Sequence, residues 1–117
     1  LGEYAGYEHC VFLQPEILLE DPDQLSESDS DLRRITVEQT TAKRAEKMQA
    51  IRQVLPEVFA EYAIPFHDVG ELAPSNANGA DLYLDYCHLT PTGAELTARR
   101  MVDPVYELVK AAIAEQN

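Results

Sequence analysis

The stretch that decides the fold of this chain is residues 82–93. It reads Leu82-Tyr83-Leu84-Asp85-Tyr86-Cys87-His88-Leu89-Thr90-Pro91-Thr92-Gly93. A short apolar run leads into a turn that contains Asp85 and His88, and a helix start follows the turn. Thr90 suits the N-cap and Pro91 the first helical position, so the sequence predicts a helix over residues 91–114.

An acid and an imidazole beside a helix N-terminus can act together as a base. The carboxylate of Asp85 can accept the Nδ1–H of His88, which leaves the other ring nitrogen free to take a proton. The carboxylate favours the imidazolium while the positive helix end disfavours it, so the resting ring can stay neutral. The sequence therefore predicts that Asp85 and His88 lie within hydrogen-bonding distance. The alternative is a structural pair that caps the helix.

Asp85 and His88, followed by Leu89, Thr90 and a glycine five residues after the histidine, resemble the last sequence block of the SGNH (GDSL) hydrolases. The similarity also covers residues 11–15, which resemble the family's fourth strand and its exit, and residues 94–114, which resemble its closing helix. An acid three residues before a histidine is a weak signal alone, so the order of strand, turn and helix carries the resemblance.

The resemblance implies a fold and an activity. The fold would be α/β, a three-layer sandwich with a parallel sheet (SGNH- or flavodoxin-like), of which residues 1–117 would form the C-terminal portion of a single domain. The activity would be hydrolysis of a small-molecule or carbohydrate ester by acyl transfer to serine, with no cofactor. His88 would be general base and then general acid, and Asp85 would orient it and stabilise its protonated form.

The nucleophile of that family lies in a Gly-Asp-Ser block, and its oxyanion donors include the asparagine of a Gly-x-Asn-Asp block. Neither block occurs in this chain. Ser26, Ser28 and Ser30 stand in an acidic run with no glycine and no preceding strand, so none of them is assigned as the nucleophile. The remainder of the hydrolase domain, with the serine and the oxyanion hole, is therefore expected outside this sequence.

The charge of the chain is strongly acidic, with 21 Asp and Glu against 9 Lys and Arg and a net charge of −12. No basic patch is available to neutralise phosphates, which argues against nucleic acid and anionic membrane surfaces as partners. No apolar run approaches the length of a membrane span. The sequence gives no targeting information, and the compartment stays undecided.

The two cysteines are too few to imply a disulfide framework. Cys10 opens an apolar stretch and is expected to be a buried small hydrophobe. Cys87 is expected to point away from its neighbour His88, which argues against a Cys–His catalytic pair. The histidines and cysteines show no metal-ligand spacing, so no metal site is predicted.

Two strands and a helix are predicted before the motif. Residues 9–14 and 64–69 suit strands, and the first is continuously apolar, as a buried parallel strand is. Residues 32–62 have a helical period, with Pro56 expected to kink the helix or start a second segment. The apolar periodicity predicts inward faces made of Met48, Ile51, Leu55, Val58, Phe59 and Tyr62 in this helix, and of Ala94, Ala98, Val102, Val105, Val109 and Ala112 in the last.

Residues 16–31 are predicted to be an acidic loop or insertion, either mobile or acting as a lid over substrate. Asp81 is interpreted as a loop or capping acid and not as a triad member. Two other functions remain open. One is a non-catalytic domain of the same fold that binds a carbohydrate or acyl group, and the other is an acidic protein-interaction module whose loop meets a basic partner.

Overall fold

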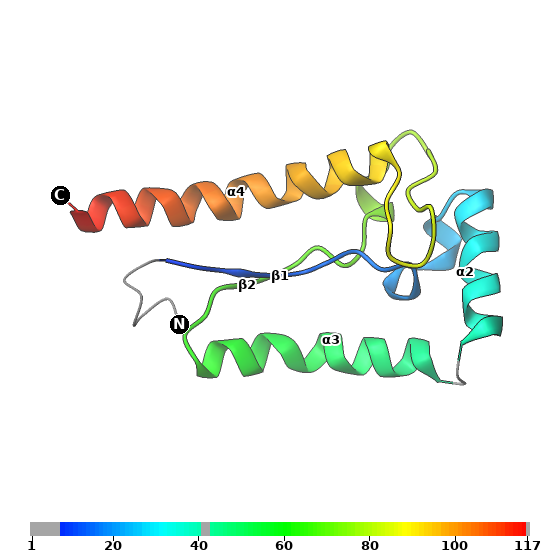
Figure 1. Cartoon of the computed structure of the whole chain (residues 1–117), viewed down its shortest axis with the longest axis horizontal. Helices are drawn as coiled ribbons and strands as arrows, with labels where there is room; N and C mark the ends of the chain where they lie inside the picture. The colour runs from blue at the N-terminus through cyan, green and yellow to red at the C-terminus, as the bar shows by residue number, and fades with distance from the viewer. Residues whose placement is uncertain (1–7, 41–42, 117) are drawn as a thin grey trace.

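The structure is a computed structural model that describes residues 8–40 and 43–116, and most of this part of the chain is helical (Figure 1). In chain order the regular elements are strand β1 (Val11–Leu13), the 3₁₀ helices η1 (Ile17–Leu19) and η2 (Pro22–Gln24), helices α2 (Glu27–Gln39) and α3 (Arg44–Glu61), strand β2 (Phe66–Asp68), the 3₁₀ helix η3 (Ala73–Ser75) and helix α4 (Pro91–Gln116).

The predicted three-layer α/β sandwich is wrong for this chain. The sheet has two strands of three residues each, paired in parallel with Phe12 opposite His67. α3 and α4 run along opposite sides of this strand pair, and α2 crosses one end of the molecule (Figure 1). The two predicted strands exist, but both are half-buried and shorter than expected. The fully buried apolar residues that follow β1 belong to η1.

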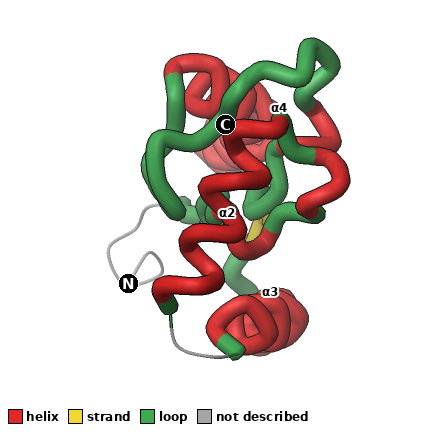
Figure 2. The backbone as a smooth tube through the Cα atoms, turned by 90° about the vertical axis from the view of Figure 1, so that its right-hand side faces the viewer, coloured by secondary structure: helices red, strands yellow, loops and turns green. Residues whose placement is uncertain are grey.

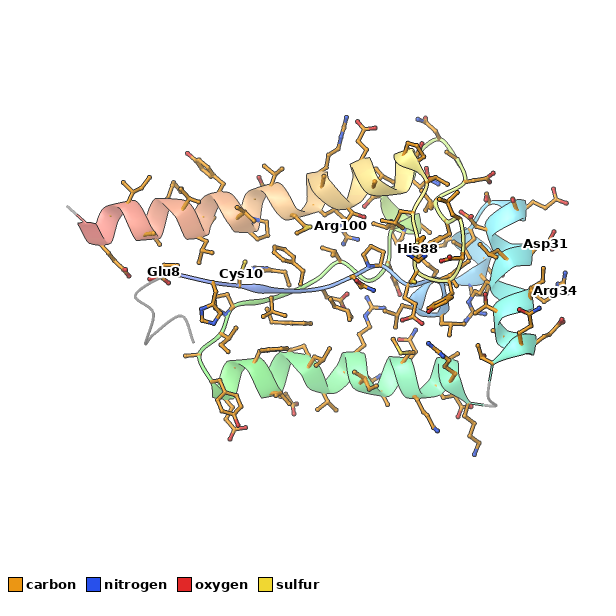
Figure 3. The ribbon with its side chains drawn as sticks, viewed as in Figure 1. Glu8, Cys10, Asp31, Arg34, His88 and Arg100 are labelled. Atoms are coloured by element: carbon orange, nitrogen blue, oxygen red, sulfur yellow. The ribbon has the colours of Figure 1, made fainter. Side chains whose placement is uncertain are left out.

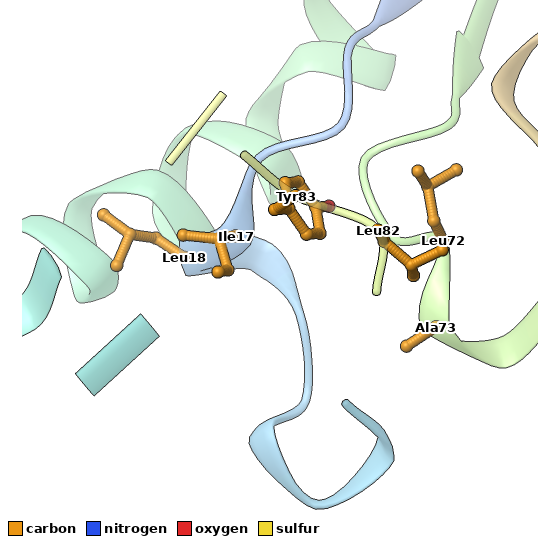
Figure 4. Packing of buried hydrophobic residues seen from close by; sticks show 6 residues of the cluster. All are labelled: Ile17, Leu18, Leu72, Ala73, Leu82 and Tyr83. Atoms are coloured by element: carbon orange, nitrogen blue, oxygen red, sulfur yellow. The ribbon is translucent and has the colours of Figure 1, made fainter. Parts of the chain in front are cut away.

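The best-buried residues lie at the end of the molecule where α2 stands. The cluster, drawn in Figure 4, consists of Ile17, Leu18, Leu72, Ala73, Leu82 and Tyr83. Each is at most 6% exposed, and they come from η1, from the start of η3 with its N-cap Leu72, and from the segment before the Asp85–His88 turn. The core therefore packs directly beneath that turn and not along the strands.

Residues 16–31 differ from the acidic loop that the sequence predicts. η1 contributes Ile17 and Leu18 to the core, and α2 already begins at Glu27. Ser26 is the N-cap of α2, since its side chain accepts the backbone N–H of Asp29. The two acids Glu20 and Asp29 are almost fully buried. The acidic residues of this segment therefore lie in the interior as well as on the surface.

The predicted helix over residues 32–62 is two helices. α2 ends at Gln39, and α3 begins after Lys43, whose φ of 74° is left-handed. The second segment therefore starts well before Pro56, which lies inside α3. Seen from the end at which α2 lies, α3 points nearly toward the viewer below α2 (Figure 2).

The predicted inward face of α3 is only partly correct. Met48, Leu55 and Phe59 are half-buried, whereas Ile51, Val58 and Tyr62 are exposed. Phe59 stacks on Phe66 of β2 with ring centroids 5.3 Å apart. Arg52, on the same helix, forms ion pairs with Asp68 at 2.5 Å and Glu71 at 2.7 Å.

α4 begins as predicted and ends two residues later than expected. The Oγ1 of Thr90 accepts the backbone N–H of Gly93, which makes Thr90 the N-cap. A Cβ on Gly93 would collide with the carbonyl oxygen of Leu82, so glycine is required where the helix crosses the preceding segment.

The predicted inward stripe of α4 is wrong, because Val102, Val105 and Val109 are 59%, 41% and 48% exposed. Pro104 and Leu108 instead line a groove against Cys10 and His67, which come from the strand side. α4 carries apolar residues on more than one side, and periodicity alone does not say which side packs. No helix in the described ranges has both the length and the apolarity to cross a membrane.

Candidate active site

The Asp85–His88 turn is closed by backbone pairing on both sides. Tyr83 and Leu89 form an antiparallel bridge, and the N–H of Leu84 donates to the carbonyl of His88 at 2.7 Å. The N–H of Thr90 donates to the carbonyl of Leu82 at 3.0 Å, which ties the turn to the start of α4. The three residues between Leu84 and His88 are therefore held by the two segments that flank them.

Asp85 and His88 form the contact that the sequence predicts. Nδ1 of His88 lies 2.8 Å from Oδ2 and 2.9 Å from Oδ1 of Asp85. Oδ1 also accepts the backbone N–H groups of Cys87 at 3.0 Å and His88 at 2.8 Å. Among the residues that the structure describes, the donors to this carboxylate therefore come from its own short turn.

The charge state of Asp85 determines where the imidazole proton is. The backbone N–H groups of Cys87 and His88, and then the His88 ring, lower the pKa of Asp85 from its usual 3.8 to about 2. The side chain is therefore an ionised carboxylate at neutral pH and can only accept hydrogen bonds. A neutral His88 must then carry its proton on Nδ1, which leaves a lone pair on Nε2.

The His88 side chain is 73% exposed, and that of Asp85 is 49% exposed. His88 lies in the loop at the α2 end of the molecule, beyond the N-terminal end of α4 (Figure 3). An exposed imidazole with a free Nε2 can receive a proton from a group that approaches from outside this chain.

Two buried carboxylates from residues 16–31 hold the segments beneath the turn. Glu20 accepts the N–H groups of Leu72 at 2.5 Å and Ala73 at 3.1 Å, and the hydroxyl of Tyr83 at 2.7 Å. Burial raises the pKa of Glu20, and these hydrogen bonds act in the opposite direction. The Glu20 carboxylate therefore fastens the chain after β2 to the first residues of the turn.

Asp29 makes a second attachment of the same kind. Its Oδ2 accepts the N–H of Leu82 at 2.6 Å, and its Oδ1 accepts the N–H of Tyr83 at 3.2 Å. Together with Glu20 it fixes the backbone just before Asp85. Neither residue was predicted from the sequence. A signal existed for Asp29 alone, as an acid three residues after the N-cap Ser26.

Asp81 is a loop acid outside the Asp85–His88 pair. Its carboxylate accepts the hydroxyl of Ser26 at 2.7 Å, and its carbonyl accepts the hydroxyl of Thr90 at 2.7 Å. Ser26 is therefore engaged as a cap and as a donor to Asp81. Across the described parts of the chain, the polar contacts of the His88 side chain go to Asp85 and to Cys87, and none reaches a serine hydroxyl.

Cys87 differs from the prediction that it points away from His88. Its Sγ lies 3.7 Å from Nδ1 of His88. One potential metal-ligating atom from each of Asp85, Cys87 and His88 falls within 4.8 Å of the others. The spacing of histidines and cysteines alone does not indicate this group, because its third member is the carboxylate of Asp85.

Comparisons with protein-family models, with curated proteins and with solved structures find no match to this chain. The turn itself defines the candidate site: an ionised aspartate contacts Nδ1 of a histidine whose side chain is largely exposed.

Proposed function

We propose that this chain supplies the acid–base pair of an ester hydrolase that works by acyl transfer to a serine. The observation that carries the proposal is the Asp85–His88 contact, with Nδ1 at 2.8 Å from Oδ2 and the ring largely exposed. The proposal also rests on the resemblance of residues 82–93 to the last block of the SGNH hydrolases. The substrate would be a small-molecule or carbohydrate ester.

In the proposed reaction His88 acts twice. Nε2 accepts the proton of the serine hydroxyl as the oxygen attacks the ester carbonyl, and His88 then returns that proton to the leaving alcohol. Asp85 keeps the ring in the tautomer with Nδ1–H and stabilises the imidazolium between the two steps. The two backbone N–H groups on Oδ1 keep the carboxylate ionised for this purpose.

The serine and the oxyanion hole of the proposed enzyme come from the remainder of the hydrolase domain. Two rows of exposed apolar side chains, one on α3 and one on α4, support the proposal that a further part of the domain packs against this chain. α3 presents Ile51, Val54 and Val58, and α4 presents Val102, Val105, Val109 and Ile113. Exposed apolar rows of this kind usually mark surfaces that another part of a protein covers.

The alternative of an acidic interaction module has less support from the structure than from the sequence, although four acids are exposed, namely Asp21, Asp23, Glu27 and Asp31. It depended on an exposed acidic loop over residues 16–31, but Glu20 and Asp29 in that segment accept internal backbone hydrogen bonds. A non-catalytic domain that binds a carbohydrate or acyl group without cleaving it remains the competitor, and kinetics separate it from the hydrolase.

The test uses the full-length protein and one short-chain ester, with kcat/KM measured for three variants. We expect His88→Ala to lower kcat by about 10⁴–10⁶-fold, because it removes both proton transfers. Asp85→Asn should cost at most about 10⁴-fold, by favouring the wrong tautomer. Asp81→Asn is the matched control and should stay close to the parent, because Asp81 does not contact His88.

Circular dichroism confirms that each variant is folded. Near-parent activity in all three variants would mean that His88 is structural and would overturn the hydrolase proposal. A loss in Asp81→Asn as large as in His88→Ala, with Asp85→Asn unaffected, would move the orienting acid to Asp81. Clear His88-dependent hydrolysis by residues 1–117 alone would place the nucleophile within this chain.

A further inference from the structure

The Asp85–His88 turn also contains a thiol, and the three side chains together form a compact set of donors. Sγ of Cys87 lies 3.7 Å from Nδ1 of His88, and Oδ2 of Asp85 lies 2.8 Å from the same nitrogen. All three ligating atoms fall within 4.8 Å of one another. The side chains are partly or largely exposed, so an ion can reach them from solvent.

These separations are close to those around a tetrahedral metal. With the usual bond lengths to zinc, a thiolate sulfur and an imidazole nitrogen lie about 3.6 Å apart, and a carboxylate oxygen and an imidazole nitrogen about 3.3 Å apart. The sulfur–nitrogen separation of 3.7 Å already fits. The oxygen–nitrogen separation of 2.8 Å has to widen by about 0.5 Å, which replaces a hydrogen bond with a bridging ion.

The backbone hydrogen bonds of the turn would allow a metal ion to replace the proton between Asp85 and His88. Both backbone donors in the turn, the N–H groups of Cys87 and His88, are on Oδ1. The imidazole Nδ1 lies near both oxygens, 2.9 Å from Oδ1 and 2.8 Å from Oδ2, and neither of these two backbone N–H groups donates to Oδ2. An ion can therefore take the place of the imidazole proton at Oδ2 while Oδ1 keeps the turn closed.

We propose that Asp85, Cys87 and His88 form a site for a borderline-soft divalent cation such as Zn²⁺, bound in place of the proton between Asp85 and His88. The three side chains supply three ligands, and water takes the fourth position. A thiolate with an imidazole selects Zn²⁺, Co²⁺ or Cd²⁺ over Mg²⁺ and Ca²⁺, which prefer sets made of oxygen alone.

The proton balance of binding follows from the ligands. The Cys87 thiol loses its proton to solvent, since only the thiolate binds a metal. The neutral His88 ring changes tautomer, because Nδ1 must present its lone pair to the ion and the ring proton moves to Nε2. Binding thus releases one proton per ion where the thiol starts protonated.

The tautomer change would also affect the proposed hydrolase function, and this one consequence rests on that proposal. With a proton on Nε2, His88 has no lone pair to accept the serine proton, so the ion would switch off the base. Metal binding itself does not depend on the hydrolase proposal. The two are therefore tested separately.

The experiment titrates the chain with Co²⁺ under non-thiol reducing conditions and follows the thiolate-to-metal charge-transfer band. We expect one equivalent to bind, release of a proton, and displacement of Co²⁺ by Zn²⁺. Cys87→Ser should abolish the band, while Cys10→Ser should retain it. Cys10 is the matched control, because it is the other cysteine and is also half-buried.

His88→Gln and Asp85→Asn keep the thiol and should show the band only at Co²⁺ concentrations at least about tenfold higher. Circular dichroism separates loss of ligand from loss of fold. An unchanged band in Cys87→Ser, loss of the band in Cys10→Ser, or equal affinity in His88→Gln would each overturn the site. None of these readings uses catalysis, so failure of the hydrolase proposal leaves them intact.

Discussion

Asp85 is held by donors that all belong to its own turn. The N–H groups of Cys87 and His88 donate to Oδ1, and the ring of His88 lies against both carboxylate oxygens. The backbone donors are the larger cause of the lowered pKa. Ionisation of Asp85 is therefore secured mainly by the conformation of the turn, and the imidazole adds to it.

This origin of the pKa gives a prediction that a carbon NMR titration can check. The Asp85 carboxyl signal should titrate with a midpoint of about 2, against the usual 3.8. Because the folded-state pKa is depressed, the stabilisation by these hydrogen bonds is present above pH 3.8 and is lost as the pH falls toward 2.

The control for this titration is His88→Ala, which removes the ring and keeps the backbone N–H. Its Asp85 midpoint should stay well below 3.8, because the two backbone donors remain. A midpoint at 3.8 in the parent would show that these donors do not engage the carboxylate in solution.

At this scale the sequence predicts the polar contacts of the turn well. Asp85 and His88 are three residues apart in a turn, and Thr90 precedes a proline, so short-range rules suffice for both. The position of Cys87 could not be predicted in this way. Its direction depends on how tightly the loop between Tyr83 and Leu89 closes, and that closure comes from a backbone bridge.

Among the elements, α2 is the one that bears most directly on the turn. Asp29 in its first turn accepts the N–H groups of Leu82 and Tyr83 through separate oxygens. Asp31, two residues later, has a side chain that is 65% exposed and faces Arg34. Two aspartates on one helix thus have opposite environments.

Replacing each by asparagine tests the difference. In Asp29→Asn the amide group must face one of two backbone donors, which leaves a buried N–H without an acceptor. We expect a loss of about 1–3 kcal/mol in the free energy of unfolding, measured by urea denaturation. Asp31→Asn should change it by about 0.5 kcal/mol at most. Equal effects would mean that Asp29 does not hold the turn.

Element boundaries were harder to predict than element types. The acids of residues 16–31 resemble a solvated run, because composition does not tell a buried acceptor from a surface charge. Lys43, which precedes α3, has a left-handed backbone conformation. It is not a glycine, so the sequence did not indicate that a new helix starts there. The start of α4 was predictable because Thr90, Pro91 and Gly93 each have a positional reason.

The whole molecule is narrow. It measures 52 by 31 by 19 Å, and its shortest dimension is less than twice the diameter of a helix, about 10–12 Å. Each side of the strand pair is therefore covered by a single helix, and the flanks of α3 and α4 stay open. Because the molecule is this narrow, the valines of α4 stay exposed and the core is small.

An open apolar row on a chain tested alone should promote self-association. We expect sedimentation velocity to show residues 1–117 forming oligomers as the concentration rises. Val105→Asp with Val109→Asp should shift the chain toward monomer, because these side chains are 41% and 48% exposed. Ala114→Asp, which is exposed and lies on the opposite side of α4 from Val105, serves as the control. Equal association in both variants would mean that the α4 row is not the contact.

At the scale of the molecule the sequence predicted the parallel pairing of its two strands but not the architecture. The sandwich was inferred from a resemblance, and three-residue strands in a two-stranded sheet do not make a central layer. The side of α4 that packs could not be predicted either. It depends on where β1 and β2 lie, and apolar residues are available on several sides of the helix.

The two buried carboxylates also constrain the order in which the chain folds. Asp29 and Leu82 are 53 residues apart, and Glu20 and Tyr83 are 63 residues apart. Because closing loops of this length costs chain entropy before the first of these contacts forms, we expect the turn to become ordered late in folding. A shortened chain that began after Asp29 would keep every residue from Leu82 to Gly93 and lose the acceptors that shape them. The motif alone is therefore not an independent folding unit.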